Sequence, residues 1–183
     1  MKRKISNIIL KLFGWKIVGD LPKDKKYLIV FAPHTSNWDF IFGRCFGYQL
    51  NIYAKFLGKS QLFQFPFGWF FRWMGGIPVN RAKSNNLVTT TIDLFNNSEY
   101  LVLGIAPEGT RSWANKWKLG FYHIAVGANI PIMLSFLDYE KKEAGIGLIL
   151  HPSGKVEEDL QKIQSYYEDI TPKFKEKYNP KIF

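Results

Sequence analysis

Short apolar runs that alternate with helical segments constrain the fold of this chain most strongly. The runs have the length of buried strands, and segments with helical spacing of apolar residues stand between most of them. The predicted strands are Tyr27–Ala32, Asn51–Phe56, Ile77–Arg81, Tyr100–Ala106, Pro131–Leu137 and Gly145–His151. The predicted helices are Asn37–Gly47, Ser84–Phe95, Lys118–Gly127 and a charged C-terminal helix, Val156–Tyr178, that Pro172 interrupts. This alternation predicts an α/β fold in which helices flank a mixed, largely parallel central sheet.

The length and composition of the chain fit one such domain. It has 183 residues, 46% of them hydrophobic, which is enough for a substantial core. We therefore expect a single domain spanning residues 1–183. The single cysteine, Cys45, excludes an internal disulfide and favours a cytoplasmic location.

The net charge of +10 is concentrated near the N-terminus, where residues 1–26 hold eight Lys or Arg against two Asp. Within residues 1–14, apolar side chains at helical spacing stand beside basic ones, which predicts a basic amphipathic helix. The apolar residues are Ile5, Ile8, Ile9, Leu12 and Phe13, and the basic ones are Lys2, Arg3, Lys4 and Lys11. Such a helix either lies on an anionic membrane surface or packs on its own domain.

No run in the sequence approaches the about 20 apolar residues that a membrane-spanning helix requires. The most apolar segment, Leu62–Met74, is interrupted by Pro66, Gly68 and Arg72. It forms either core or a lipid-facing wall. The aromatic residues cluster in apolar runs rather than between basic residues, and no nucleic-acid-binding motif is present, so we expect no nucleic-acid partner.

Polar clusters follow two of the predicted strands. His34-Thr-Ser-Asn-Trp-Asp39 follows the first strand, and Pro107-Glu-Gly-Thr-Arg111 follows the fourth. With Ser36 as the N-cap of the next helix, Asp39 occupies the third helical position and points its carboxylate back toward His34. A carboxylate behind a histidine fixes its tautomer and stabilises the imidazolium, as a general base requires.

Four motifs in this order resemble those of the glycerolipid (1-acylglycerol-3-phosphate) acyltransferases. His34 and Asp39 match the family's first motif, and Glu108-Gly-Thr-Arg111 matches its third. Gly75–Arg81 and Ile130–Met133 correspond to its second and fourth. The resemblance covers roughly residues 27–137 and implies an α/β fold of the glycerol-phosphate acyltransferase type.

The chain departs from the family pattern in three places. Pro33 stands where the family usually has Asn, Ile77-Pro78 replaces an apolar or aromatic pair, and Asn80 replaces a common Asp. None of these changes removes a group that transfers a proton. The second motif lines the acceptor site in the family, so the departures bear on the identity of the acceptor.

The resemblance implies an enzyme that moves a fatty acyl group from acyl-CoA or acyl-carrier protein to the hydroxyl of a lysophospholipid, above all 1-acylglycerol-3-phosphate, giving phosphatidate. His34 would be the general base, and Asp39 would orient it. The arginines would bind the acceptor phosphate, Lys59 would add a point charge, and Glu108 would contact the glycerol part. The implied substrate-binding residues are Lys59, Arg81, Glu108, Gly109, Thr110 and Arg111.

Two alternatives stay open at this stage. The acceptor could instead carry no phosphate, as in an amino-acid-headed lipid, or the protein could be a non-catalytic peripheral lipid-binding protein. His123 and His151 lack metal-ligand spacing, so we expect no metal and no cofactor other than the acyl donor. The expected location is peripheral, on the cytoplasmic face of the cell membrane.

Overall fold

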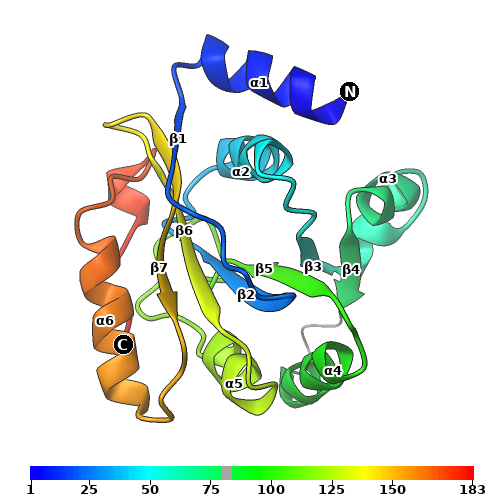
Figure 1. Ribbon diagram of the computed structural model, residues 1–183, viewed down its shortest axis with the longest axis vertical. Helices are drawn as coiled ribbons and strands as arrows, with labels where there is room; N and C mark the ends of the chain where they lie inside the picture. Colours follow the sequence, from blue (N-terminus) through cyan, green and yellow to red (C-terminus); the bar gives the residue numbers. More distant parts are fainter. Residues whose placement is uncertain (80–83) are drawn as a thin grey trace.

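A seven-stranded sheet lies at the centre of the part of the chain that the structure describes (Figure 1). The computed structural model describes the backbone of residues 1–79 and 84–183, and the side chains of these residues except 84–86. Across the sheet the strand order is β1-β7-β6-β2-β5-β3-β4. The strands are β1 (Lys16–Val18), β2 (Lys26–Phe31), β3 (Lys55–Lys59), β4 (Gly76–Val79), β5 (Leu101–Ile105), β6 (Ile132–Asp138) and β7 (Glu143–Leu150).

The strands from β6 across to β4 all run parallel to one another. Strand β7 is antiparallel to β6, and β1 pairs in parallel with β7. The predicted α/β class with a mixed, largely parallel sheet is therefore confirmed. Because β2 lies between β5 and β6, the carboxyl ends of these three strands meet at one edge, where α/β sheets usually carry their sites.

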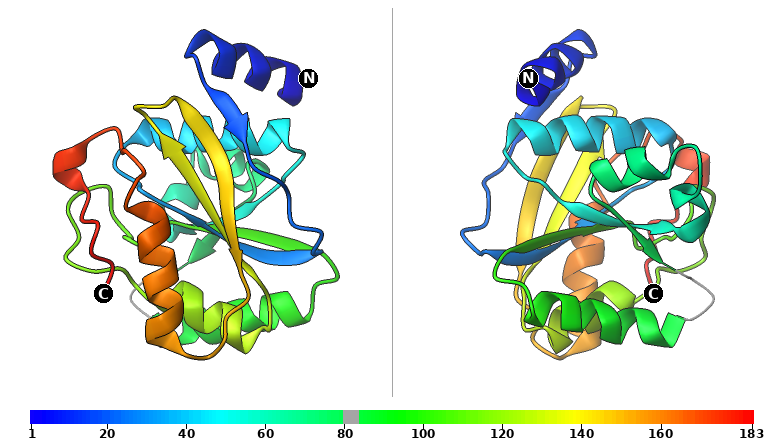
Figure 2. Two further views of the ribbon diagram at one scale, coloured as in Figure 1. Left: turned by 60° about the vertical axis from the view of Figure 1, so that its left-hand side comes forward. Right: turned by 90° about the vertical axis from the view of Figure 1, so that its right-hand side faces the viewer.

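Helices cover both faces of this sheet (Figure 1, Figure 2). Helices α1 and α2 lie on one face, α4, α5 and α6 on the other, and α3 lies beside α2 near β4. The helices are α1 (Lys2–Leu12), α2 (Asn37–Gln49), α3 (Gly68–Trp73), α4 (Ser84–Asn96), α5 (Gly120–Gly127) and α6 (Val156–Tyr167), with 3-10 turns η1 (Ser60–Phe63) and η2 (Lys175–Lys177).

Alternation along the central strands divides the core into two layers. On β2, Leu28 and Val30 pack toward α4, α5 and α6, whereas Tyr27 and Ile29 pack toward α1 and α2. Every residue of β6 is buried. Burial on both faces explains why these strands appear in the sequence as continuous apolar runs rather than alternating ones.

Two predicted boundaries were wrong. The C-terminal helix ends at Tyr167, before Pro172, because the chain turns to cross the end of β6, where the carbonyl of Thr171 accepts the backbone N–H of Tyr139. The strand predicted at Asn51–Phe56 is β3, which starts later and spans Lys55–Lys59, because the chain first turns through Asn51 at a positive φ of 57°. Strand β1 and helix α3 were missed, since both are too short to show a period.

The predicted N-terminal helix is confirmed over Lys2–Leu12. It packs on α2 with Ser6 and Leu10 buried, and it leaves Ile5 and Ile8 exposed. The helix thus packs on its own domain through one side and presents apolar side chains to solvent on another. None of the helices in the described part of the chain is long and apolar enough to cross a membrane.

Candidate active site

A capping box fixes the loop between β2 and α2. The Oγ of Ser36 accepts a hydrogen bond from the backbone N–H of Trp38 at 3.2 Å. In return, Oδ2 of Asp39 accepts the backbone N–H groups of Ser36 and Thr35, both at 2.8 Å. The cap predicted from the sequence is therefore confirmed, and it directs the carboxylate back over the loop that carries His34.

The same carboxylate faces the imidazole. Oδ2 of Asp39 lies 3.3 Å from Nδ1 of His34. The two atoms lack the alignment of a hydrogen bond, and among the described residues Nδ1 has no hydrogen-bond partner. The side chain of Asp39 is 1% exposed and that of His34 is 18% exposed. A buried acid thus stands behind a ring that solvent still reaches, and catalytic hydrogen bonds are often loose before substrate binds.

A tyrosine that the sequence analysis missed holds the other oxygen of this carboxylate. The hydroxyl of Tyr139 donates to Oδ1 of Asp39 at 2.6 Å. Burial, together with this hydrogen bond, raises the pKa of Tyr139, so the phenol stays a neutral donor. Tyr139 directly follows β6, beside β2 in the sheet. Polar residues that directly follow a predicted strand identified the His34 and Glu108 clusters, and the same criterion applied to the strand that ends near Leu137 would have identified Tyr139.

Glu108 braces the His34 loop from the opposite side. Its Oε1 accepts the backbone N–H of His34 at 2.9 Å, and the residue is only 7% exposed. Its Oε2 is buried and has no hydrogen-bond partner in the described part of the chain. Burial raises the pKa of the Glu108 carboxyl to about 8. The carboxyl group thus connects the segment after β5 to the loop after β2.

Gly109 allows the chain to turn sharply next to a lysine. Its φ is +67°, and a Cβ at this position would lie 3.1 Å from both Cε and Nζ of Lys118. This left-handed conformation and the close approach both favour glycine. Lys118, which the sequence analysis did not select, therefore brings an ammonium group to the Glu108–Arg111 motif.

Arg111 lies exposed beside the start of α2. Its Nη1 donates to Oδ1 of Asn37, the first residue of that helix. Thr110 is also exposed, and its Oγ1 accepts the backbone N–H of Ser112 at 3.2 Å. The structure therefore brings Arg111 next to the loop that carries His34.

The two remaining predicted cations lie further along the sheet. Lys59 is exposed at the carboxyl end of β3, on the same edge as His34 but separated from β2 by β5. Arg81 lies outside the described residues. In the described part of the chain, no group of three or more His, Cys, Asp or Glu residues is placed to hold a metal ion.

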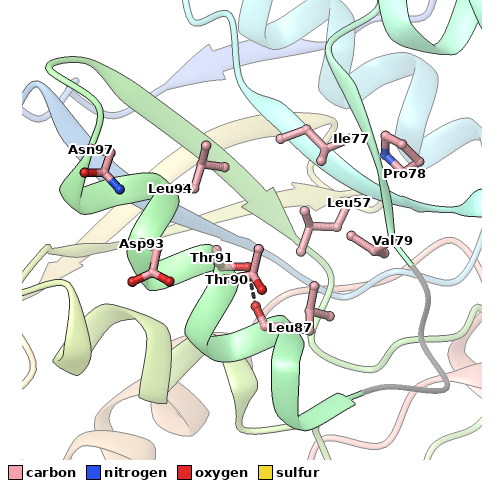
Figure 3. A pocket seen from close by; sticks show the side chains of 10 residues that line it. All are labelled: Leu57, Ile77, Pro78, Val79, Leu87, Thr90, Thr91, Asp93, Leu94 and Asn97. Atoms are coloured by element: carbon pink, nitrogen blue, oxygen red, sulfur yellow. Dashed lines mark hydrogen bonds between the residues drawn. The ribbon is translucent and has the colours of Figure 1, made fainter.

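An apolar groove of about 390 Å³ runs between α4 and the strands β3 and β4 (Figure 3). Leu57 and Ile77 line it from the strands, and Leu87 and Leu94 line it from the helix. The groove lies on the face of the sheet opposite α2, and β5 separates it from β2. It is therefore distinct from the site around His34.

Comparison with known proteins identifies the family. The sequence profile of the Acyltransferase family matches residues 16–133, which include both the His34–Asp39 and the Glu108–Arg111 motifs. The chain belongs to this family. It is an acyltransferase, and the resemblance of its motifs to those of the glycerolipid acyltransferases is confirmed.

The fold is similar to that of a solved acyltransferase. The crystal structure of the 1-acyl-sn-glycerophosphate (LPA) acyltransferase PlsC from Thermotoga maritima superimposes with a TM-score of 0.60. The likeness covers 88% of this chain and 73% of that chain, at 20% sequence identity, and it shows a shared architecture. No curated protein matches the chain significantly.

The elevated pKa of Glu108 predicts how stability depends on pH. The folded state raises this pKa from an ordinary 4.5 to about 8, so it binds the proton more tightly than the unfolded chain does. The free energy of unfolding should therefore fall as pH rises from about 4.5 to about 8, by roughly 3 to 5 kcal/mol at most. Urea unfolding of the wild type and of Glu108→Gln across this range measures the effect. The free energy of unfolding of Glu108→Gln should lack this part of the pH dependence. If it fell with pH in parallel with that of the wild type, the raised pKa would not belong to Glu108.

Proposed function

We propose that this acyltransferase moves a fatty acyl group from the thioester of acyl-CoA or acyl-carrier protein to the hydroxyl of a lysophospholipid, with His34 as general base. The observation that carries the proposal is the 3.3 Å approach of Nδ1 of His34 to the buried carboxylate of Asp39. Both residues match the first motif of the family, and the ring remains accessible at the carboxyl edge of the sheet.

The proposed reaction uses the far nitrogen of the imidazole. Because Nδ1 lies on the side of the ring that is next to Asp39, Nε2 is left to accept the proton of the acceptor hydroxyl as its oxygen attacks the thioester carbonyl. The tetrahedral intermediate then collapses, the carbon–sulfur bond breaks, and the imidazolium returns its proton to the leaving thiolate. Asp39 stabilises the imidazolium throughout. The donor is already activated, so no covalent enzyme intermediate and no further cofactor are needed.

The preferred acceptor is 1-acylglycerol-3-phosphate, which would yield phosphatidate. Arg111 and Lys118 place two cationic groups at the edge that carries the base, and an arginine fork suits a phosphate. We assign Lys59, Arg81 and Thr110 to the same acceptor as further cationic or hydrogen-bonding groups. The structural neighbour PlsC is described as a 1-acyl-sn-glycerophosphate acyltransferase, which supports this choice. Glu108 would hold the His34 loop in position through the backbone N–H of His34, and Gly109 would let Lys118 approach the acceptor site closely.

A second candidate is an acceptor without phosphate, such as an amino-acid-headed lipid. The hydrogen bond from Arg111 to Asn37 favours it, because one nitrogen of the exposed guanidinium already donates to a side chain of the protein. Both candidates are lipids that reside in a bilayer. We therefore place the protein peripherally on the inner, anionic face of the cell membrane, held in part by the basic helix α1.

Removal of the base tests the reaction directly. His34→Ala should lower kcat by about 10² to 10⁴, because general-base catalysis by a positioned histidine contributes that much. The measurement is acyl transfer from a labelled thioester to 1-acylglycerol-3-phosphate. His123→Ala, at an exposed position on α5, is the matched control and should keep full activity. A His34→Ala enzyme as active as this control would rule out the proposed base.

Arg111 distinguishes the two acceptors. For a phosphorylated acceptor, Arg111→Ala should raise the acceptor KM about tenfold or more while leaving the donor KM unchanged, because a charge-assisted hydrogen bond is lost. Arg111→Lys should restore part of the affinity, since it retains the charge without the fork. Equal changes in both KM values would instead favour the acceptor without phosphate.

A further inference from the structure

The segment between β3 and β4 exposes a group of aromatic side chains. Phe65 is 99% exposed and Trp69 is 71% exposed, and Phe67 and Trp73 are also exposed. The sequence left open whether this segment forms core or a lipid-facing wall. Its aromatic residues largely face outward, and contiguous exposed apolar side chains usually mark a contact surface.

The segment is folded rather than loose, because one of its aromatic rings anchors it. Phe63 is buried, and its ring lies so close to Gly58 and Gly76 that a Cβ at either glycine would come within 3 Å of it. The guanidinium of Arg72 donates to the carbonyl of Phe63 at 3.1 Å. These contacts hold the other aromatic side chains out toward solvent.

Helix α1 also exposes apolar side chains, and its first residue contacts α3. The ammonium group of Lys2 lies 4.1 Å from the ring centroid of Trp73, so the start of α1 contacts α3. Directly after α1, the ring of Phe13 lies 5.7 Å from that of Trp38, next to the His34 loop. Exposed apolar side chains therefore extend from α3 across α1 to the start of α2. They include Ile5, Ile8, Leu12, Phe13, Trp38 and Ile41.

The charge of this side of the molecule indicates what covers it. Residues 1–19 and 37–79, which form α1, α2 and α3 together with β1, β3, η1 and β4, contain nine Lys or Arg and a single acid, Asp39, which is buried. The other 14 of the 15 acidic residues lie outside these two stretches. Basic groups around exposed Trp and Phe side chains complement the anionic headgroups and the interfacial zone of a bilayer.

We propose that the segment Leu62–Trp73 is a membrane-insertion element that acts together with α1. The basic helix supplies electrostatic attraction to anionic lipid, and Phe65, Phe67 and Trp69 bury in the boundary between headgroups and acyl chains. This docking would place Trp38 and the adjoining His34 loop at the membrane plane, where a lipid acceptor resides. The inference goes beyond the proposed function because it assigns a lipid contact to a segment outside the catalytic site.

Co-sedimentation with vesicles tests the proposal. The double variant Phe65→Ser/Trp69→Ser should bind vesicles of phosphatidylcholine and phosphatidylglycerol about 100-fold more weakly than the wild type, since each of the two buried aromatic side chains contributes about one factor of ten. Both positions are exposed, so the fold should survive, as circular dichroism can verify. The matched control is Tyr100→Ser, which replaces an exposed aromatic residue at the opposite edge of the sheet and should bind normally.

Salt separates the two parts of the surface. High salt screens the attraction of α1 to the lipid, so the binding that persists there should depend on the aromatic residues and be absent in the double variant. Unchanged vesicle binding by the double variant would overturn the proposal. A second result would also overturn the proposal. If light scattering showed that the wild type is a dimer and the double variant a monomer, and both bound vesicles equally well, a second copy of the chain rather than lipid would cover the aromatic surface.

Activity on a detergent-dispersed lysophospholipid keeps this test separate from the proposed function. The double variant should retain wild-type kcat there, because no membrane docking is required. Loss of vesicle binding with this activity intact supports the insertion element. Loss of activity in detergent as well would place the aromatic residues in the catalytic site and overturn it.

Discussion

The buried carboxylate of Asp39 is the interaction on which the proposed catalytic site depends. It accepts the backbone N–H groups of Thr35 and Ser36 and the hydroxyl of Tyr139, and it faces the imidazole of His34. Burial of an unpaired carboxylate is costly, so these donors are needed to hold it in place. The same group therefore begins α2, shapes the loop after β2, and supplies the charge that a general base requires.

Parallel strands bring the other parts of the site to this carboxylate. Tyr139 and Asp39 are 100 positions apart in the chain, and Glu108 and His34 are 74 apart. They meet because β6, β2 and β5 are neighbours in the sheet and end at the same edge. The His34 loop is thus braced by β6 through Tyr139 and by β5 through Glu108. Preorganisation of this kind keeps a base in position without reorganisation during the reaction.

The sequence predicted the local features of the site better than its tertiary contacts. The start of α2 and the direction of Asp39 followed from cap chemistry, which acts within four residues. The orientation of Glu108 did not follow, because whether a carboxyl after β5 faces lipid or the His34 backbone depends on how β5 packs beside β2. Which aromatic residues of Leu62–Met74 are buried also depends on tertiary packing. Composition alone cannot separate Phe63, which is buried, from Phe65, which is exposed.

The substitution Asp39→Asn tests whether the charge of this carboxylate supports the base. An amide keeps an acceptor for the two backbone N–H groups but removes the charge that stabilises the imidazolium, so the capping role and the catalytic role separate. The measurement is transfer of a labelled acyl group to 1-acylglycerol-3-phosphate, read by mass spectrometry of the lipid product. If Asp39 stabilises the imidazolium, kcat should be at least about 100-fold below that of the wild type in a variant that melts at nearly the same temperature. A kcat equal to that of the wild type would contradict this role.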